Sequence, residues 1–446
     1  MYKFLTCVLL LGLASVSSTC LADPIKPVQL GQSVLRLNGP WKFHTGDDAR
    51  WAGSGFDDSA WESMNLYAPP DANDGDVGIA PYISGWSKQG HPNYHGYAWY
   101  RLRVAVTPPA GETLALLGPW AVDSSYQVYA NGILLGGVGD FSAATPTAYG
   151  NHYPRYFELP PELTKGGPIT FAIRVWAGPW VGGTGGIHVA PVIGTRDAIS
   201  AQYRLQWLKI VEGYAVDVVP ALLFFLAAAM VLCLWRLERA NRAYPWLAAA
   251  LLCSGLQRGN QAIFFWLQIE TIQDYVIFIL TLVGSCTLGA WMMAWRAWFK
   301  LDKPAWLPKL VAALTAIYAV AHLVAYPWLY HAAFPHAVTR TMYYLITWTH
   351  HAFLLVYLAI LFLGIRREGR EGWHALPTAL AIGMVLFISE VVLLHVPGIW
   401  FPFGVGVSTS EYASVISVLL LSALLLRRLW SRAAVSQPTA LEESPA

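Results

Sequence analysis

The chain has 446 residues, of which 55% are hydrophobic and 13% are charged, and its formal net charge is +2. This apolar balance excludes an ordinary soluble protein, and the near-neutral charge gives no indication of nucleic-acid binding. The apolar residues are distributed unevenly, because residues 24–200 are rich in Gly, Pro and polar turns while residues 214–430 carry long apolar runs. The length therefore accommodates two parts of different character.

The N-terminus has the pattern of a signal peptide. Lys3 supplies a positive charge, Phe4–Val16 form an apolar core, and Cys20–Ala22 provide a small-residue cleavage site before Asp23. We therefore expect residues 1–22 to direct export and residues 23–203 to form an exported domain. Of the five cysteines, two lie in this leader and three in apolar stretches. The exported domain contains none, so it is expected to fold without disulfides.

Short alternating segments predict β-structure in the exported domain. Tyr97–Val106 and Ile169–Trp176 alternate between apolar and polar residues, as half-buried strands do. Ser125–Tyr129 leads into Asn131-Gly132, a pair that is typical of a tight hairpin turn. Because no long helical period interrupts these strands, the pattern favours an antiparallel sandwich over an α/β domain.

Four segments make a family resemblance specific. They are Leu37–Phe43 (LNGPWKF), Phe56–Trp61 (FDDSAW), Gly96–Arg101 (GYAWYR) and Val128–Gly132 (VYANG). In order and rough spacing they resemble the sugar-binding jelly roll of glycoside hydrolase family 2, a galactose-binding-like all-β fold. The resemblance implies a carbohydrate-binding module. The catalytic barrel of that family does not follow, so we expect no glycosidase activity and no enzyme.

Loop aromatics are the candidate ligand-binding residues of this domain. Aromatic faces stack on sugar rings, and a few placed polar groups bond the hydroxyls. The candidates lie in three loop-like stretches and are Trp86, His91, His152, Tyr153, Trp176 and Trp180. The alternative is that these side chains pack against the outer loops of the membrane part. The motif aromatics are instead expected in the core, namely Trp41, Trp61, Trp99 and Tyr100.

Seven apolar stretches each approach the ~20 residues that cross a bilayer. They lie at 213–235, 244–267, 274–297, 305–328, 340–365, 373–396 and 409–430. Arginines and lysines follow the first, third, fifth and seventh stretches, whereas loops 268–273, 329–339 and 397–408 contain none. The positive-inside rule then places the N-terminal domain outside and the C-terminus inside. We predict an all-α seven-helix transmembrane bundle over 204–430 in a bacterial inner membrane, with a periplasmic β-domain and a cytoplasmic tail at 431–446.

Polar residues inside these stretches are costly in lipid and therefore mark candidate functional positions. They include Arg258, Asn260, His322, His350, His351 and Glu390, and the topology places them in one layer nearer the outer face. Three interpretations stay open: a structural Arg258–Glu390 pair, a ligand or signal-coupling pocket, and metal or haem ligation by the histidines. Adjacent His350 and His351 point to different helix faces, which disfavours a single metal site, and we expect no cofactor. A retinal protein is excluded because 409–430 contains no Lys.

The order of leader, β-domain and seven spans resembles the bacterial seven-transmembrane receptors with diverse intracellular signalling modules. The resemblance implies a sensor that binds a carbohydrate-like or other small ligand outside and signals inward. Members of that family usually continue into a signalling enzyme, whereas Ser431–Ala446 are too short and polar to fold. The output is therefore expected to pass to a separate cytoplasmic partner. Two alternatives are a membrane enzyme or redox protein using the polar layer, and an assembly factor that holds a cell-envelope glycan.

Overall fold

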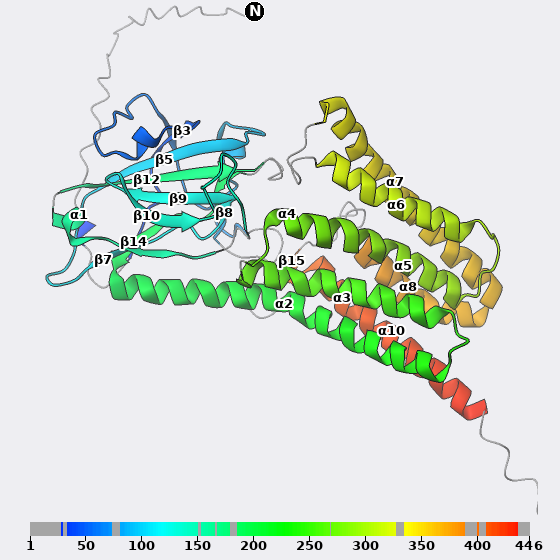
Figure 1. The fold of residues 1–446 in the computed structure, drawn as a ribbon. Helices are drawn as coiled ribbons and strands as arrows, with labels where there is room; N and C mark the ends of the chain where they lie inside the picture. The colour runs from blue at the N-terminus through cyan, green and yellow to red at the C-terminus, as the bar shows by residue number, and fades with distance from the viewer. Residues whose placement is uncertain are drawn as a thin grey trace, which may run out of the picture.

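A computed structural model describes residues 28–29, 34–73, 81–149, 153–165, 167–178, 185–267, 269–326, 334–388, 399–400 and 407–435. Residues 28–195, here called the β-domain, form sheets at one end of the molecule (Figure 1). Residues 196–435, the helix bundle, extend away from it as long helices (Figure 1).

Two antiparallel sheets make up most of the β-domain. The larger has the order β10-β9-β12-β5-β3-β4, with bounds Ile133–Val138, Ser125–Ala130, Ile169–Ala177, Gly96–Val104, Trp41–Thr45 and Glu62–Met64. The smaller has the order β11-β7-β14-β2, with bounds Tyr156–Glu158, Leu114–Leu117, Val192–Thr195 and Leu35–Arg36. Side chains from both sheets, such as Phe171 and Leu116, belong to one buried core, so the sheets pack face to face. The β-rich domain is confirmed, while its assignment as a jelly roll stays a prediction.

Residues of the four segments that carry the family resemblance are buried or form contacts that stabilise the β-domain. The predicted core aromatics Trp41, Trp61, Trp99 and Tyr100 are all buried. Arg101, at the end of the GYAWYR segment, is buried and its Nε donates to Asp58 Oδ2 at 2.8 Å. Asp58 belongs to the FDDSAW segment, so this ion pair joins two motifs that are far apart in the sequence. These motif residues therefore hold the fold together.

The predicted hairpin is confirmed. Asn131 and Gly132 connect β9 to β10 with φ angles of 48° and 86°. Two successive residues with positive φ form the turn whose twist matches that of the flanking strands, and Asn-Gly is the pair that adopts it most readily.

Most of the helix bundle is built from long apolar helices. They are α2 Arg196–Leu237, α3 Ala243–Leu267, α5 Gly284–Trp298, α6 Leu307–Ala325, α7 His336–Glu368, α8 Arg370–Leu386 and α10 Thr409–Val435, and a three-residue helix, α4 Ile272–Asp274, lies between α3 and α5. Within the described residues, five segments are long and apolar enough to cross a membrane: Arg196–Leu237, Ile272–Trp298, Leu307–Ala325, Ala337–Glu368 and Thr409–Trp430. The predicted second and sixth spans coincide with α3 and α8, which are not among the five. The polar run around Arg258 lowers the hydropathy of α3, and α8 is shorter. The structure thus supports five candidate membrane spans, and the total of seven spans stays a prediction.

Helix α2 links the two parts of the molecule. It begins with Thr195 as N-cap and continues without a break for 42 residues. Its first turns run beneath the β-domain, where it packs against β7 and β14, and its later turns belong to the helix bundle (Figure 1). The predicted domain boundary at residue 203 therefore falls within a continuous helix.

Candidate functional site in the helix bundle

The structure buries two of the predicted sugar-binding aromatics, Trp86 and Trp176. Trp86 is fully buried and its Nε1 donates to the Tyr94 carbonyl at 3.2 Å, while Trp176 is buried on β12. Neither ring face is available to stack on a sugar in this conformation. His91 is partly buried, with its Nε2 2.8 Å from Glu62 Oε1.

The other predicted loop positions divide between the interface with α2 and segments outside the described residues. The ring of Tyr153 packs edge-on against Trp207 of α2, with centroids 4.9 Å apart. The alternative interpretation was packing against the outer loops of the membrane part, and the observed partner is instead a helix. His152 and Trp180 lie outside the described residues. The loop aromatics thus do not come together as one accessible sugar platform within the described part of the β-domain.

A compact apolar cluster joins the β-domain to the helix bundle. This junction cluster consists of Trp120, Ala121, Val189, Ile210, Tyr214 and Ala262. The first three belong to the β-domain, the next two to α2, and the last to α3. Tyr214 also stacks on Phe265 with ring centroids 4.0 Å apart. A movement of these β-domain loops would therefore act directly on two helices, because packed side chains resist being pulled apart.

Next to the junction cluster lies a buried ionic pair, His188 and Asp123. His188 Nε2 lies 2.8 Å from Asp123 Oδ2, its Nδ1 lies 2.6 Å from the Ile83 carbonyl, and Tyr82 stacks on the ring at 4.6 Å. Both partners of the ring are acceptors, so both nitrogens donate only when the imidazole is protonated. Burial disfavours that charge, but the Asp123 carboxylate and the two hydrogen bonds outweigh it and raise the pKa of His188. This pair was missed by the sequence analysis.

A second buried ionic group connects three helices. Arg258 of α3 places Nη1 3.4 Å from Asp217 Oδ1 on α2 and 3.1 Å from Glu411 Oε1 on α10. The two carboxylates are 0% and 2% exposed, and Arg258 is 18% exposed. The Ser408 backbone N–H donates to Glu411 Oε2 at 2.5 Å, which fixes the carboxylate further. The predicted partner of Arg258 was Glu390, which lies outside the described residues.

The two carboxylate partners of Arg258 carried a sequence signal that was not used. Asp217 lies inside the first predicted span and Glu411 at the start of the seventh. An acidic residue in either position is costly in lipid unless a cation pairs with it. Arg258 is the arginine that lies deepest within a predicted span, so pairing each acidic residue in a span with it would have proposed these contacts alongside Glu390.

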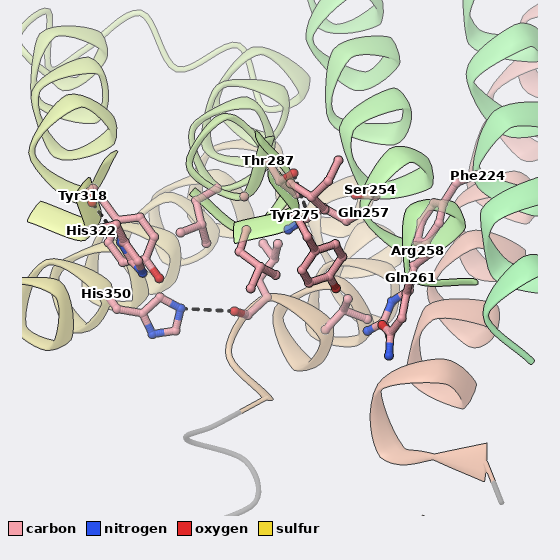
Figure 2. A pocket seen from close by; sticks show the side chains of 16 residues that line it. Phe224, Ser254, Gln257, Arg258, Gln261, Tyr275, Thr287, Tyr318, His322 and His350 are labelled. Carbon is pink, nitrogen blue, oxygen red and sulfur yellow. Dashed lines mark hydrogen bonds between the residues drawn. The ribbon is translucent and has the colours of Figure 1, made fainter. Parts of the chain in front are cut away.

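A cavity of about 430 Å³ opens beside Arg258, between the helices. Figure 2 shows Arg258 and Gln261 at one end and His322 and His350 at the other, with Tyr275 between them. This volume is within the range of small-molecule sites, which combine apolar walls with a few placed polar groups. The apolar lining comes from Phe224, Ile279, Leu280, Leu288, Val385 and Leu386.

Hydrogen bonds orient the two cavity histidines. His322 Nδ1 lies 2.9 Å from the Tyr318 carbonyl, so this nitrogen carries the proton and Nε2 is left as an acceptor in the neutral ring. His350 Nε2 donates to the Leu386 carbonyl at 3.3 Å (Figure 2). The cavity therefore combines the acceptor Nε2 of His322 at one end with the guanidinium of Arg258 at the other. Such a lining suits a small polar molecule that carries both donors and acceptors.

The wall next to the histidines has an unusual backbone. Tyr275–Val283, called η3, form a π-helical stretch between α4 and α5, and Gly284 follows it. Such stretches are rare and often occur at functional sites. Across the cavity, Thr287 Oγ1 donates to Gln257 Oε1 at 2.9 Å, which ties α5 to α3. The polar link thus fixes the helix that follows the π-helical stretch, while Tyr275, Ile279 and Leu280 of the stretch itself line the cavity.

The predicted polar layer is only partly brought together. Arg258, His322 and His350 line the cavity. Asn260 instead donates to Glu270 at 2.7 Å, and His351 packs near Trp348, so neither is a lining residue. Across the described residues, no three His, Cys, Asp or Glu side chains gather as metal ligands would.

Comparison with known proteins gives limited similarity. No protein-family model and no curated protein matches this chain. Among solved structures, a Bacteroides uniformis β-glucuronidase matches at 25% identity over 36% of this chain and 17% of the enzyme, with a TM-score of 0.26. A β-glycosidase from Bacteroides vulgatus matches at 22% identity over 36% of this chain and 20% of the enzyme, with a TM-score of 0.25. The chain thus spans a fifth or less of these enzymes, and the weak, partial similarity assigns no activity.

Proposed function

We propose that this chain is a membrane sensor rather than an enzyme. Its β-domain would face the periplasm of a bacterial inner membrane, and its helices would pass a signal to a separate cytoplasmic protein. The ligand would be carbohydrate-like or another small polar molecule. The observation that carries the proposal is the continuous α2 together with the junction cluster, because these connect the β-domain directly to the helices that line the cavity.

The charge distribution supports the proposed orientation. Basic residues gather at the ends of the helices far from the β-domain: Arg236, Arg239, Arg242, Arg296, Lys300, Lys303, Arg366, Arg367, Arg370, Arg427, Arg428 and Arg432. Such an excess is typical of the cytoplasmic side. A ligand would drive signalling only by binding one arrangement of the helices more tightly than another.

Ligand-induced stabilisation of the full-length protein in detergent tests the proposal. The probes are mono- and disaccharides, uronic acids and peptidoglycan fragments. A compound at 100 times its dissociation constant should stabilise the folded protein by about 2.7 kcal/mol, which is seen as a raised melting temperature. A panel without any saturable shift would contradict a small-molecule input of this class.

Two variants would locate the ligand. Loss of the shift in Trp180→Ala would assign it to the β-domain loops. Loss in Gly284→Leu would assign it to the helix bundle, because Gly284 lines the cavity and an added Cβ would lie 3.2 Å from Gln257 Nε2, another lining atom. Cys286→Leu adds bulk on the same helix at an exposed position outside the cavity, and should leave the shift unchanged.

A membrane enzyme is the second candidate, and the histidine-lined end of the cavity favours it. His322 Nε2 is oriented as an acceptor at the cavity, as a general base would be. If turnover of a candidate substrate is detected, His322→Gln should lower kcat at least tenfold under this hypothesis. Under the sensor proposal the same variant would change ligand affinity, and no turnover would be found.

A further inference from the structure

A second pocket lies at the end of the helix bundle far from the β-domain. It has a volume of about 800 Å³ and is formed by the connection from α2 to α3, the end of α5 and the last turns of α10. Five basic side chains line it against two acidic ones: Arg239, Arg242, Arg296, Lys300 and Arg428, with Glu238 and Asp302. The pocket therefore carries an excess of positive charge, and we refer to it as the basic pocket.

Two of the four arginines of the basic pocket are held in place by aromatic rings. Arg428 lies 4.4 Å over the Trp298 ring, and Arg239 lies 4.8 Å over Trp235. Stacking engages the flat face of a guanidinium and does not use the N–H groups that lie in its plane. Less conformational freedom is then lost when an anion binds, because the side chains are already positioned.

Arg296 supplies an unsatisfied donor. Its Nη2 donates to the Asp302 carbonyl at 3.5 Å, whereas its Nε is buried and has no hydrogen-bond partner among the described residues. A buried N–H without a partner is costly, and a charged one more so. An oxygen of a bound anion would remove that cost.

Exposed tryptophans indicate the depth of the basic pocket. Trp246, which lines the pocket, is 41% exposed, and Trp430 near the end of α10 is 81% exposed. Trp306 before α6 and Trp373 near the start of α8 are also exposed. Tryptophans at helix ends concentrate at the level of the lipid headgroups. A basic pocket at this depth lies at the level of the phosphate groups of the bilayer. This position favours a lipid headgroup over a soluble protein as its ligand.

We propose that the basic pocket binds the phosphate headgroup of an anionic phospholipid. Guanidinium groups match phosphate oxygens with paired, charge-assisted hydrogen bonds, and basic pockets between helices suit anionic headgroups. Bound lipid would hold the ends of α3, α5 and α10 together. This inference depends on membrane insertion and is independent of whether the chain is a sensor.

Native mass spectrometry of the full-length protein, released from micelles containing equal phosphatidylglycerol and phosphatidylcholine, tests the site. The wild type should retain phosphatidylglycerol preferentially. The double variant Arg296→Gln/Arg428→Gln should lose affinity for it about 30-fold, since each basic residue near the surface contributes about 1 kcal/mol. Arg366→Gln, at an exposed position outside the pocket, should behave as wild type.

Arg296→Lys/Arg428→Lys retains the charge and should restore part of the preference, which separates lipid binding from misfolding. Equal retention of both lipids by the wild type would overturn the proposal, as would equal loss in Arg366→Gln. Displacement of phosphatidylglycerol by inorganic phosphate or by a polyglutamate peptide, at concentrations well below the lipid, would assign the pocket to a soluble anion and overturn it too.

Discussion

Arg258→Gln is expected to destabilise the helix bundle by about 3–5 kcal/mol, because it leaves buried carboxylates without their cation. Asp217 and Glu411 are almost fully buried, so water does not replace the lost guanidinium. The three groups lie on α2, α3 and α10, and the loss should therefore loosen contacts among all three helices. Chemical unfolding of the purified protein in detergent measures the effect.

Restoring charge balance provides the control for this prediction. The triple variant Asp217→Asn/Arg258→Gln/Glu411→Gln removes the charges together and should regain most of the lost stability, since amides can hydrogen-bond to one another. Arg204→Gln, at an exposed position on α2, should change stability by no more than about 0.5 kcal/mol. A single Arg258→Gln variant as stable as the wild type would show that the ionic group does not hold the helices.

Asp123→Asn is expected to destabilise the β-domain by about 3–5 kcal/mol at pH 6, by removing the counter-ion of buried His188. The raised pKa of His188 sets the pH dependence of this loss. A histidine whose pKa is higher when folded contributes its full stabilisation below its unfolded value of about 6.5. That stabilisation disappears as the pH rises through the folded value. The difference between wild type and variant should therefore be largest near pH 6 and shrink at higher pH.

Thermal or chemical unfolding at several pH values between 5.5 and 9 measures this difference, and nitrogen chemical shifts of the His188 ring report its charge directly. His44→Gln, at an exposed histidine, serves as the control and should give a difference that is small at every pH. A His188 ring that is neutral at pH 6, or a stability difference that does not vary with pH, would contradict the predicted ion pair.

Sequence patterns predicted those parts of the fold that depend on local rules. Alternation in 97–106 and 169–176 corresponds to β5 and β12, and Asn131-Gly132 forms the hairpin turn. The long apolar stretches became helices because their backbone groups are satisfied within each segment. The extra length of α2 was missed, because hydropathy detects only its apolar part, whereas its first turns carry polar residues and pack beside the β-domain.

The candidate sites were harder to predict, because they depend on how distant segments approach each other. Trp86 lies in a polar, loop-like stretch, yet it is buried against Gly185 and Gly186, whose positive φ angles and missing side chains let the backbone approach its ring. Counting residues from the end of each span placed Arg258 and Glu390 at a similar depth in the membrane. Depth alone does not determine which neighbouring helix a side chain faces. The direction of Arg258 towards Asp217 and Glu411 follows from the packing of α2, α3 and α10, and no pattern within one helix encodes it.

The most direct test of the proposed sensor is a distance measurement across the helix bundle in lipid nanodiscs. Spin labels would be placed at Leu426→Cys on α10 and Lys309→Cys on α6, both exposed, after Cys233, Cys253 and Cys286 are replaced by serine. We predict that a saturating compound from the stabilising panel changes the distance between the labels. The change should be lost in Tyr214→Leu, which removes the stacking contact with Phe265 beside the junction cluster. A compound that binds and stabilises the protein while the distance distribution stays the same would contradict signalling through the helices.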